Sequence, residues 1–260
     1  MSVKPAFFSR KFKAFSVDGC LRRGVHPTIR RLFFPLYSYD TAKSGPFTNA
    51  RERGMKKETR LKSGLFAGLL VDTEMKRSVT LLTKYNLPTE AFVSHKNQML
   101  YAEKFKYQME AKDCKSLKKK LSVGVNRIFQ SLLTVNLKPV STQTIVGCSI
   151  LKVATAVDLV CKDLQGRVVI VEIKTGFMHY YRRFRGYMNV LTPSVTDCPY
   201  HQHQLQLLLT YQLYRSTFPS HKMGNAFVIR VDAIGVDILP LCDVVKNNAS
   251  RIFSAVESSK

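Results

Sequence analysis

The sequence is poor in acidic residues: 18 Asp and Glu stand against 41 Lys and Arg among 260 residues, a formal net charge of +23. This excess is large for an enzyme of small metabolites. It favours a polyanionic partner, because a basic surface neutralises phosphates and releases their counterions. A protein that packages nucleic acid would need nothing beyond this charge. We expect DNA as the partner, as double-stranded ends or single strands.

Long apolar runs and paired cysteines are also missing. No apolar run approaches the ~20 residues that a membrane-spanning helix needs, so we expect no membrane partner. The six cysteines form no C-x-x-C pair and no metal-ligand spacing with histidines, which indicates a reducing, intracellular compartment. We expect the nucleus or another site of DNA replication. The basic first 17 residues, which contain no acid, keep a mitochondrial presequence as the alternative.

Two apolar, β-branched runs, over residues 153–161 and 168–176, are each interrupted by charged residues. In the second run, Glu172 and Lys174 are two residues apart and therefore point to the same face of a strand. The polar segment between the runs predicts a hairpin, which would bring Asp158 beside both charges. Buried charges need partners or a metal, and two neighbouring carboxylates suit Mg²⁺, with Mn²⁺ as a substitute.

The arrangement D-x13-E-x-K resembles the active site of the PD-(D/E)XK nuclease superfamily, above all its RecB-like, lambda-exonuclease-like and viral alkaline exonuclease-like branches. Val157 stands where the namesake motif has proline. The resemblance implies that Asp158, Glu172 and the backbone carbonyl of Ile173 bind metal. Lys174 would orient or deprotonate the attacking water and screen charge on the phosphate. The alternative is a structural ion pair within an ordinary sheet.

A glutamine-rich amphipathic helix is expected over about 201–215. Gln202 and Gln206 are four residues apart and share a face, and their amides can donate to phosphate oxygens. The pattern Q-x-Q-x-Q-x-x-x-T resembles the helix after the catalytic strand in phage-type and viral alkaline exonucleases, so both glutamines are candidate catalytic residues. The Q-x-x-x-Y signature of the RecB branch fits less well, because Tyr211 lies five residues after Gln206. A solvated helix face is the alternative.

An earlier helix is expected to begin near residue 65. In the resembled family, such a helix carries an acid or histidine four residues after a glycine, as an outer metal ligand, and Gly68 and Asp72 match this spacing. Glu74 lies about 200° further round the helix, so both acids cannot face one metal. We favour Asp72. An exposed acid that caps or solvates the helix is the alternative.

Aromatic and basic residues alternate just after the second charged run. Tyr181, Arg182, Arg183 and Arg185 are of the types that stack on unpaired bases and grip phosphates, which makes them candidate nucleic-acid contacts. A basic surface loop is the alternative.

Residues 1–60 are basic and interrupted by prolines, and we expect a partly irregular arm there, followed by a nuclease-like domain over 61–260. Helical patterns precede residue 137. Strands are then expected at 145–151, in the two charged runs, and near 226–231 and 236–241, with a closing helix at about 243–256. This order predicts an α/β fold. The resemblance implies a restriction-endonuclease-like core, a mixed central β-sheet flanked by helices, with a basic N-terminal extension.

The expected function is that of a Mg²⁺-dependent deoxyribonuclease, a phosphodiester hydrolase in replication, recombination or repair, with exonuclease action favoured over endonuclease action. The alternatives are a catalytically inactive nucleic-acid-binding protein with the same fold, and an endonuclease that acts on RNA or branched DNA.

Overall fold

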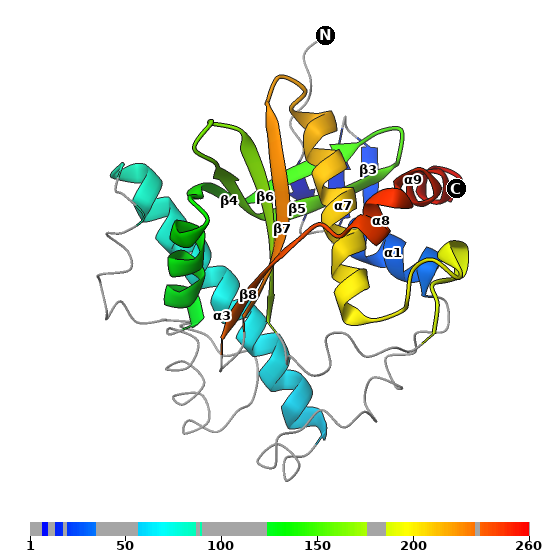
Figure 1. The fold of residues 1–260 in the computed structure, drawn as a ribbon, viewed down its shortest axis with the longest axis horizontal. Coiled ribbons are helices and arrows are strands. Elements are labelled where there is room, and N and C mark those ends of the chain that lie inside the picture. Colours follow the sequence, from blue (N-terminus) through cyan, green and yellow to red (C-terminus); the bar gives the residue numbers. More distant parts are fainter. Residues whose placement is uncertain are drawn as a thin grey trace.

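The computed structural model describes residues 7–9, 14–17, 20–34, 57–86, 89, 124–175, 186–231 and 235–259, and shows an α/β protein (Figure 1). The strands are β1 (Phe7–Ser9), β2 (Ala14–Val17), β3 (Cys20–Gly24), β4 (Lys138–Cys148), β5 (Val153–Lys162), β6 (Val168–Thr175), β7 (Met223–Val231) and β8 (Val236–Pro240). The helices are α1 (Val25–Phe33), α3 (Lys57–Lys84), α7 (Pro199–Thr217), α8 (Asp243–Asn247) and α9 (Ala249–Glu257), with a 3-10 helix η2 (Asn189–Leu191). A further helix spans 124–134.

The strands form one mixed, open sheet in the order β1-β2-β3-β5-β6-β7-β8, with β4 paired to β5 beside this path. The pairs β3–β5 and β6–β7 are parallel, and the other pairs are antiparallel. Strand β5 pairs with β4 along its length, with β3 at residues 153–154 and with β6 at residues 159–162. The two strands that carry the charged motif therefore lie in the middle of the sheet.

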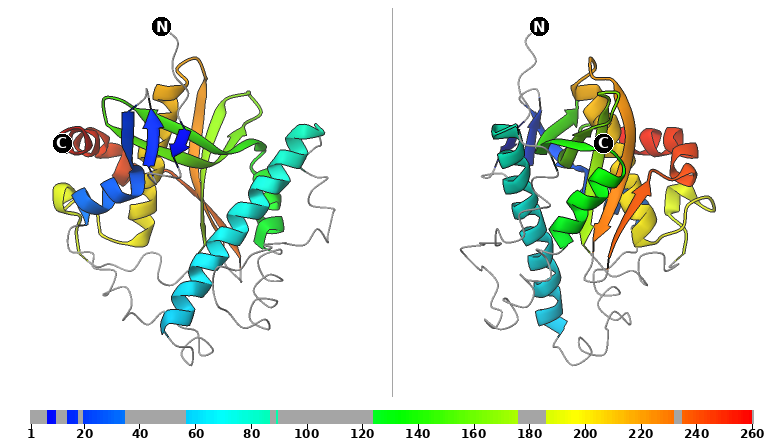
Figure 2. Two further views of the ribbon diagram at one scale, coloured as in Figure 1. Left: turned by 180° about the vertical axis from the view of Figure 1, so that it is seen from behind. Right: turned by 60° about the vertical axis from the view of Figure 1, so that its left-hand side comes forward.

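Helices cover both faces of the sheet (Figure 2). Helix α3 and the helix over 124–134 lie on one face, where Met75 and Phe129 pack against sheet residues such as Val171. On the other face, α1, α7, α8 and α9 pack in a second apolar core, which includes Leu205 of α7 and Ile170 of β6. Burial on both faces explains why β5 and β6 are apolar almost throughout.

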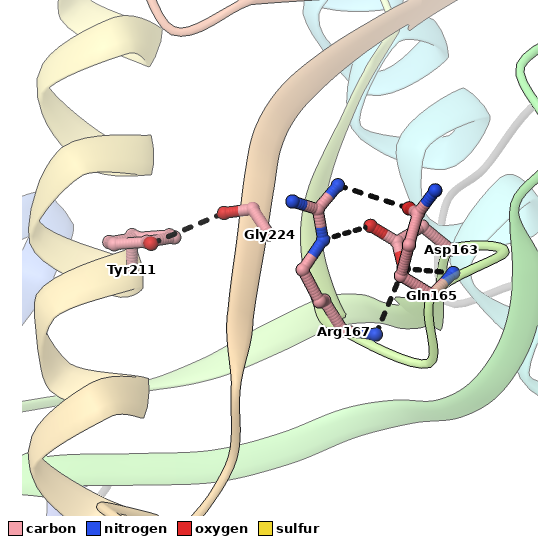
Figure 3. Close-up of polar contacts among 5 residues, drawn as sticks. All are labelled: Asp163, Gln165, Arg167, Tyr211 and Gly224. Atoms are coloured by element: carbon pink, nitrogen blue, oxygen red, sulfur yellow. Dashed lines mark hydrogen bonds and ion pairs between the residues drawn. The ribbon is translucent and has the colours of Figure 1, made fainter.

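The turn between β5 and β6 is closed by its own polar side chains (Figure 3). Asp163 Oδ1 accepts hydrogen bonds from the backbone N–H groups of Gln165 and Arg167 at 3.0 and 2.9 Å. Arg167 Nε donates to Asp163 Oδ2 at 2.7 Å. Gly166 adopts φ +72°, a conformation that favours glycine. These residues confirm the hairpin that the sequence predicts, and the hairpin fixes how β5 and β6 face each other.

Gly224 at the start of β7 lets the turn between β5 and β6 lie close to β7. A Cβ atom there would lie 3.2 Å from Asp163 Oδ2 and 3.2 Å from Val169, closer than most side chains tolerate. On the other side, the hydroxyl of Tyr211 in α7 donates to the carbonyl of Gly224 at 3.2 Å (Figure 3). Tyr211 therefore joins α7 to the sheet at the end where the hairpin turns.

The described residues between 7 and 34 of the expected N-terminal arm form strands and a helix. Strand β3 pairs in parallel with β5, and α1 buries Val25, Ile29 and Phe33 in the core on the α7 side of the sheet. The prolines limit α1 without preventing it: Pro27 lies in the first turn, where the missing N–H is not needed, and Pro35 follows the last residues of the helix. Residues 20–34 therefore belong to the sheet and its core.

The remaining elements lie close to their expected positions. The glutamine-rich helix is α7, and four of its leucines, Leu205, Leu208, Leu209 and Leu213, are buried, as in an amphipathic helix. The strand expected at 145–151 is β4, which begins earlier, at Lys138, and ends at Cys148. The closing helix is divided at Asn248 into α8 and α9. The sequence thus predicts the order of these elements correctly and misplaces some of their ends.

Cys148, Cys161, Cys198 and Cys242, the cysteines whose side chains the structure describes, are free thiols. Within the described parts of the chain, every helix is too short or too polar to cross a lipid bilayer.

Candidate active site

Asp158 lies where the pairing of β5 is interrupted. The ladder between β5 and β6 ends with the pair Leu159 and Val171, one step before Asp158 and Glu172 would face each other. At this point Oδ2 of Asp158 accepts a hydrogen bond from the backbone N–H of Ile173 at 2.9 Å. The carboxylate takes the place of a backbone partner, which holds it between the two strands and beside Glu172.

Glu172 is the most enclosed charged group of the site, with 1% of the residue exposed. Its Oε1 accepts from Nζ of Lys174 at 2.5 Å and from the side-chain amide of Gln206 on α7. Its Oε2 is buried and has no hydrogen-bond partner among the residues that the structure describes. A buried carboxylate oxygen without a partner is unfavourable by itself, and is stabilised when a proton or a cation binds it.

The electrostatics of this cluster follow from its burial. Burial, and next the neighbouring carboxylate of Asp158, raise the pKa of Glu172 to about 8 although Lys174 opposes the shift. Burial would lower the pKa of Lys174, but the carboxylates of Glu172 and Asp158 outweigh it, and the pKa of Lys174 is raised. In the metal-free protein Lys174 is therefore an ammonium group at neutral pH, a hydrogen-bond donor and a positive charge.

Asp72 reaches the same region from α3. Its Oδ1 accepts a hydrogen bond from Nε2 of Gln143 at 2.6 Å. Burial raises the pKa of Asp72, and the charge of Asp158 raises it further, so these two acids lie close enough to repel each other. Glu74 is buried elsewhere, and its neighbouring charge is Arg77. Of Asp72 and Glu74, Asp72 is the one that the structure brings to Asp158.

Gln202 and Gln206, the two candidate catalytic glutamines of α7, have different partners. Nε2 of Gln202 donates to Oδ1 of Asp197, in the loop before α7, at 2.9 Å. Gln206, one turn further along, bonds with Glu172. The shared face of the helix is real, but the loop that precedes α7 supplies an acid that takes the first glutamine away from Glu172.

Gln143 is the site residue that the sequence does not reveal. It lies in β4 and contacts an aspartate 71 residues earlier, so no local spacing or periodicity links the two. The expected nucleic-acid contacts, Tyr181, Arg182, Arg183 and Arg185, lie outside the described residues.

A scan against protein-family models matches none, and a search of curated proteins returns no match either. The chemistry of the site therefore has to be inferred from its own atoms.

The donor set fits a hard divalent cation. Asp158 and Glu172 present carboxylate oxygens side by side, and Oε2 of Glu172 has no other partner in the described structure. In the part of the chain that the structure describes, no three His, Cys, Asp or Glu side chains form a metal-holding cluster. Mg²⁺ is commonly bound through one or two carboxylates, with water and substrate phosphate completing its shell, so the pair Asp158 and Glu172 provides what it needs.

Proposed function

We propose that this protein is a Mg²⁺-dependent deoxyribonuclease, an exonuclease by preference, that hydrolyses phosphodiester bonds in replication, recombination or repair. The observation that carries the proposal is that the two carboxylate oxygens of Glu172 have different surroundings. One oxygen is held by an ammonium and an amide, and the other is buried without a partner beside a second carboxylate. An ordinary structural ion pair would leave neither a bare oxygen nor a second acid at the same place.

Each residue has a role that its contacts support. Asp158 and Glu172, with the backbone carbonyl of Ile173, would hold the cation. When bound, Mg²⁺ supplies Lewis-acid stabilisation of the negative charge that develops on the phosphate. Lys174 would donate hydrogen bonds to the attacking water and to phosphate oxygens. Its positive charge would stabilise the developing negative charge more strongly than in water, because burial excludes solvent from the site. Gln206 holds Glu172 in place.

DNA is the proposed polymer because of the net charge of +23, which would attract a polyanion and make binding fall steeply with salt. The same charge favours a second candidate, a catalytically inactive protein that binds nucleic acid. The two functions differ in whether the acids and lysine of the site are needed after binding. An endonuclease acting on RNA or branched DNA would use the same site on another substrate.

The experiment compares digestion of end-labelled linear DNA and covalently closed circular DNA, with Mg²⁺ and with EDTA. An exonuclease degrades only the linear form, an endonuclease cuts both, and EDTA stops either. Failure of the wild-type protein to cut either DNA in Mg²⁺ or Mn²⁺ contradicts the proposed enzyme and leaves the inactive binder and the endonuclease acting on RNA or branched DNA, which digestion of those two substrates would separate.

Two lysine variants make this test specific. Lys174→Ala should abolish cleavage and keep DNA binding. Lys246→Ala removes the same positive charge from a surface ion pair with Asp243, and should leave both properties intact. If Lys174→Ala cuts as fast as Lys246→Ala, the assignment of the active site is wrong.

A further inference from the structure

Gln143 has an unusual backbone conformation for a residue inside a strand, with φ +53°. The other non-glycine residues of the described chain with positive φ are Asn86, Asn136 and Lys152, and all three lie in turns. Side chains with a Cβ adopt this region at a cost, and such strain persists where the surrounding structure compensates for it. Gln143 lies in an 11-residue strand, where an extended backbone would be the default.

This conformation interrupts the sheet at the candidate site. The pairs between β4 and β5 pass from Thr142 and Leu159 to Thr144 and Val157, so Gln143 and Asp158 face each other without pairing. The pairing of β5 with β6 also ends beside Asp158. Asp158 is thus released from the ladders on both of its sides, and its carboxylate can turn to the backbone N–H of Ile173.

The side chain of Gln143 bridges the sheet and α3. Its amide nitrogen donates to Asp72 at 2.6 Å, and Asp72 lies within range of repulsion by Asp158. Without a fixed donor, this repulsion would favour movement of Asp72 away from the sheet. The hydrogen bond therefore holds a further negative charge near Asp158, outside the pair of acids that would contact the cation.

We propose that Gln143 is a positioning residue that strengthens cation binding: its strained backbone directs the amide to Asp72 and keeps that carboxylate beside Asp158. The inference rests on the proposed function, since it gives Asp72 a purpose at the same cation site. Outer-shell hydrogen bonds of this kind typically change metal affinity by about 10- to 100-fold.

The test uses Gln143→Gly, because glycine adopts positive φ without strain and removes the side chain with its amide. We expect the metal-free protein to melt at the same temperature or higher. Its Mn²⁺ affinity in calorimetry should be about tenfold weaker, with a matching loss of DNA cleavage. Gln130→Ala, at an exposed position of the helix over 124–134, is the glutamine control and should bind Mn²⁺ like the wild type.

A double-mutant cycle with Asp72→Asn separates a positioning role from a general one. If Gln143 acts through Asp72, the change to glycine should not weaken Mn²⁺ binding further when residue 72 already lacks its charge. Equal weakening in both backgrounds would overturn the inference, as would wild-type affinity in Gln143→Gly, or a lowered melting temperature with unchanged affinity. If the role of Gln143 is overturned in one of these ways but the wild-type protein binds Mn²⁺ and cuts DNA, the proposed function is still supported. A wild-type protein that does neither overturns both.

Discussion

Gln206 of α7 donates its side-chain amide to the same oxygen of Glu172 that accepts from Lys174. This contact joins a helix to the central strand at a buried carboxylate, 34 residues away along the chain. Because one oxygen of Glu172 receives both donors, the other oxygen is the one left for a cation or a proton. The asymmetry of this carboxylate underlies the predictions that follow.

Replacing Gln206 with leucine should reduce DNA cleavage about tenfold, by analogy with other hydrogen bonds that orient metal-binding carboxylates. Leucine fills a similar volume and keeps helix propensity, so the loss would come from the missing donor. Gln202→Leu is the comparison one turn away, where the amide bonds with Asp197, and its loss should be clearly smaller. Steady-state cleavage of end-labelled DNA measures both. Equal losses would mean that the two glutamines act together after all.

The stability of the metal-free protein should fall as pH rises from about 5 to 8. Glu172 has a pKa of about 8 in the folded chain against a usual 4.5, so between these values the folded state binds more protons than the unfolded state. One proton changes the unfolding free energy by at most about 1.4 kcal/mol per pH unit. Burial also raises the pKa values of Asp72 and Glu74, which act in the same direction.

Melting temperatures measured in EDTA between about pH 5 and 8 test this fall of stability with pH. Glu172→Gln should make the slope shallower without removing it, because Asp72 and Glu74, whose pKa values are also raised, still titrate. Lys174 contributes nothing to the slope below pH 8, since its raised pKa keeps it protonated in both states. A melting temperature of the wild type that is constant or rises with pH would contradict the burial of a protonated Glu172.

Divalent cations should restore the stability that the metal-free protein loses at pH 8. A ligand at 100 times its dissociation constant stabilises the folded state by about 2.7 kcal/mol, provided that it does not bind the unfolded chain. We expect Mn²⁺ and Mg²⁺ to raise the melting temperature of the wild type, and EDTA to restore the original value. Asp158→Asn should lose most of this shift. Asp243→Asn, which removes an exposed acid from α8, should keep it.

The sequence predicts the centre of the fold well because the information there is local. The runs of β5 and β6 are apolar on both faces, and the turn between them contains the residues that close it, so their pairing and the neighbourhood of Asp158 and Glu172 follow. The N-terminal strands have three to five residues each, too few for a recognisable period. They form because they pair with one another and with β5, which the sequence does not display.

The difference between local patterns and contacts of distant segments also applies to the site. Asp158, Glu172 and Lys174 belong to one hairpin, and strand alternation is enough to group them. The contact of Gln143 with Asp72 depends on where α3 crosses the sheet and on a backbone conformation that glutamine does not favour. Neither feature has a pattern in the sequence.

Two ion pairs of similar chemistry should differ greatly in their effect on stability. Arg230 in β7 has 1% of its side chain exposed, and its Nε and Nη2 both donate to Oδ2 of Asp237 in β8, at 2.8 and 2.5 Å. Lys246 and Asp243 form a pair at 3.0 Å whose side chains are 51% and 85% exposed. Removing one partner of a buried pair weakens the compensation of the other charge, whereas solvent replaces an exposed partner.

Asp237→Ala should therefore lower the unfolding free energy by about 3 kcal/mol, near the lower end for buried pairs because Asp237 is itself partly exposed. Asp243→Ala should change it by no more than about 0.5 kcal/mol. Urea unfolding monitored by circular dichroism measures both variants against the wild type. Arg230 also lies beside Lys174 in the parallel register of β6 and β7, so a shift of β8 would reach the site through its neighbour. If Asp237→Ala unfolds at the same urea concentration as the wild type, the ion pair with Asp237 does not stabilise the fold, and other contacts hold Arg230.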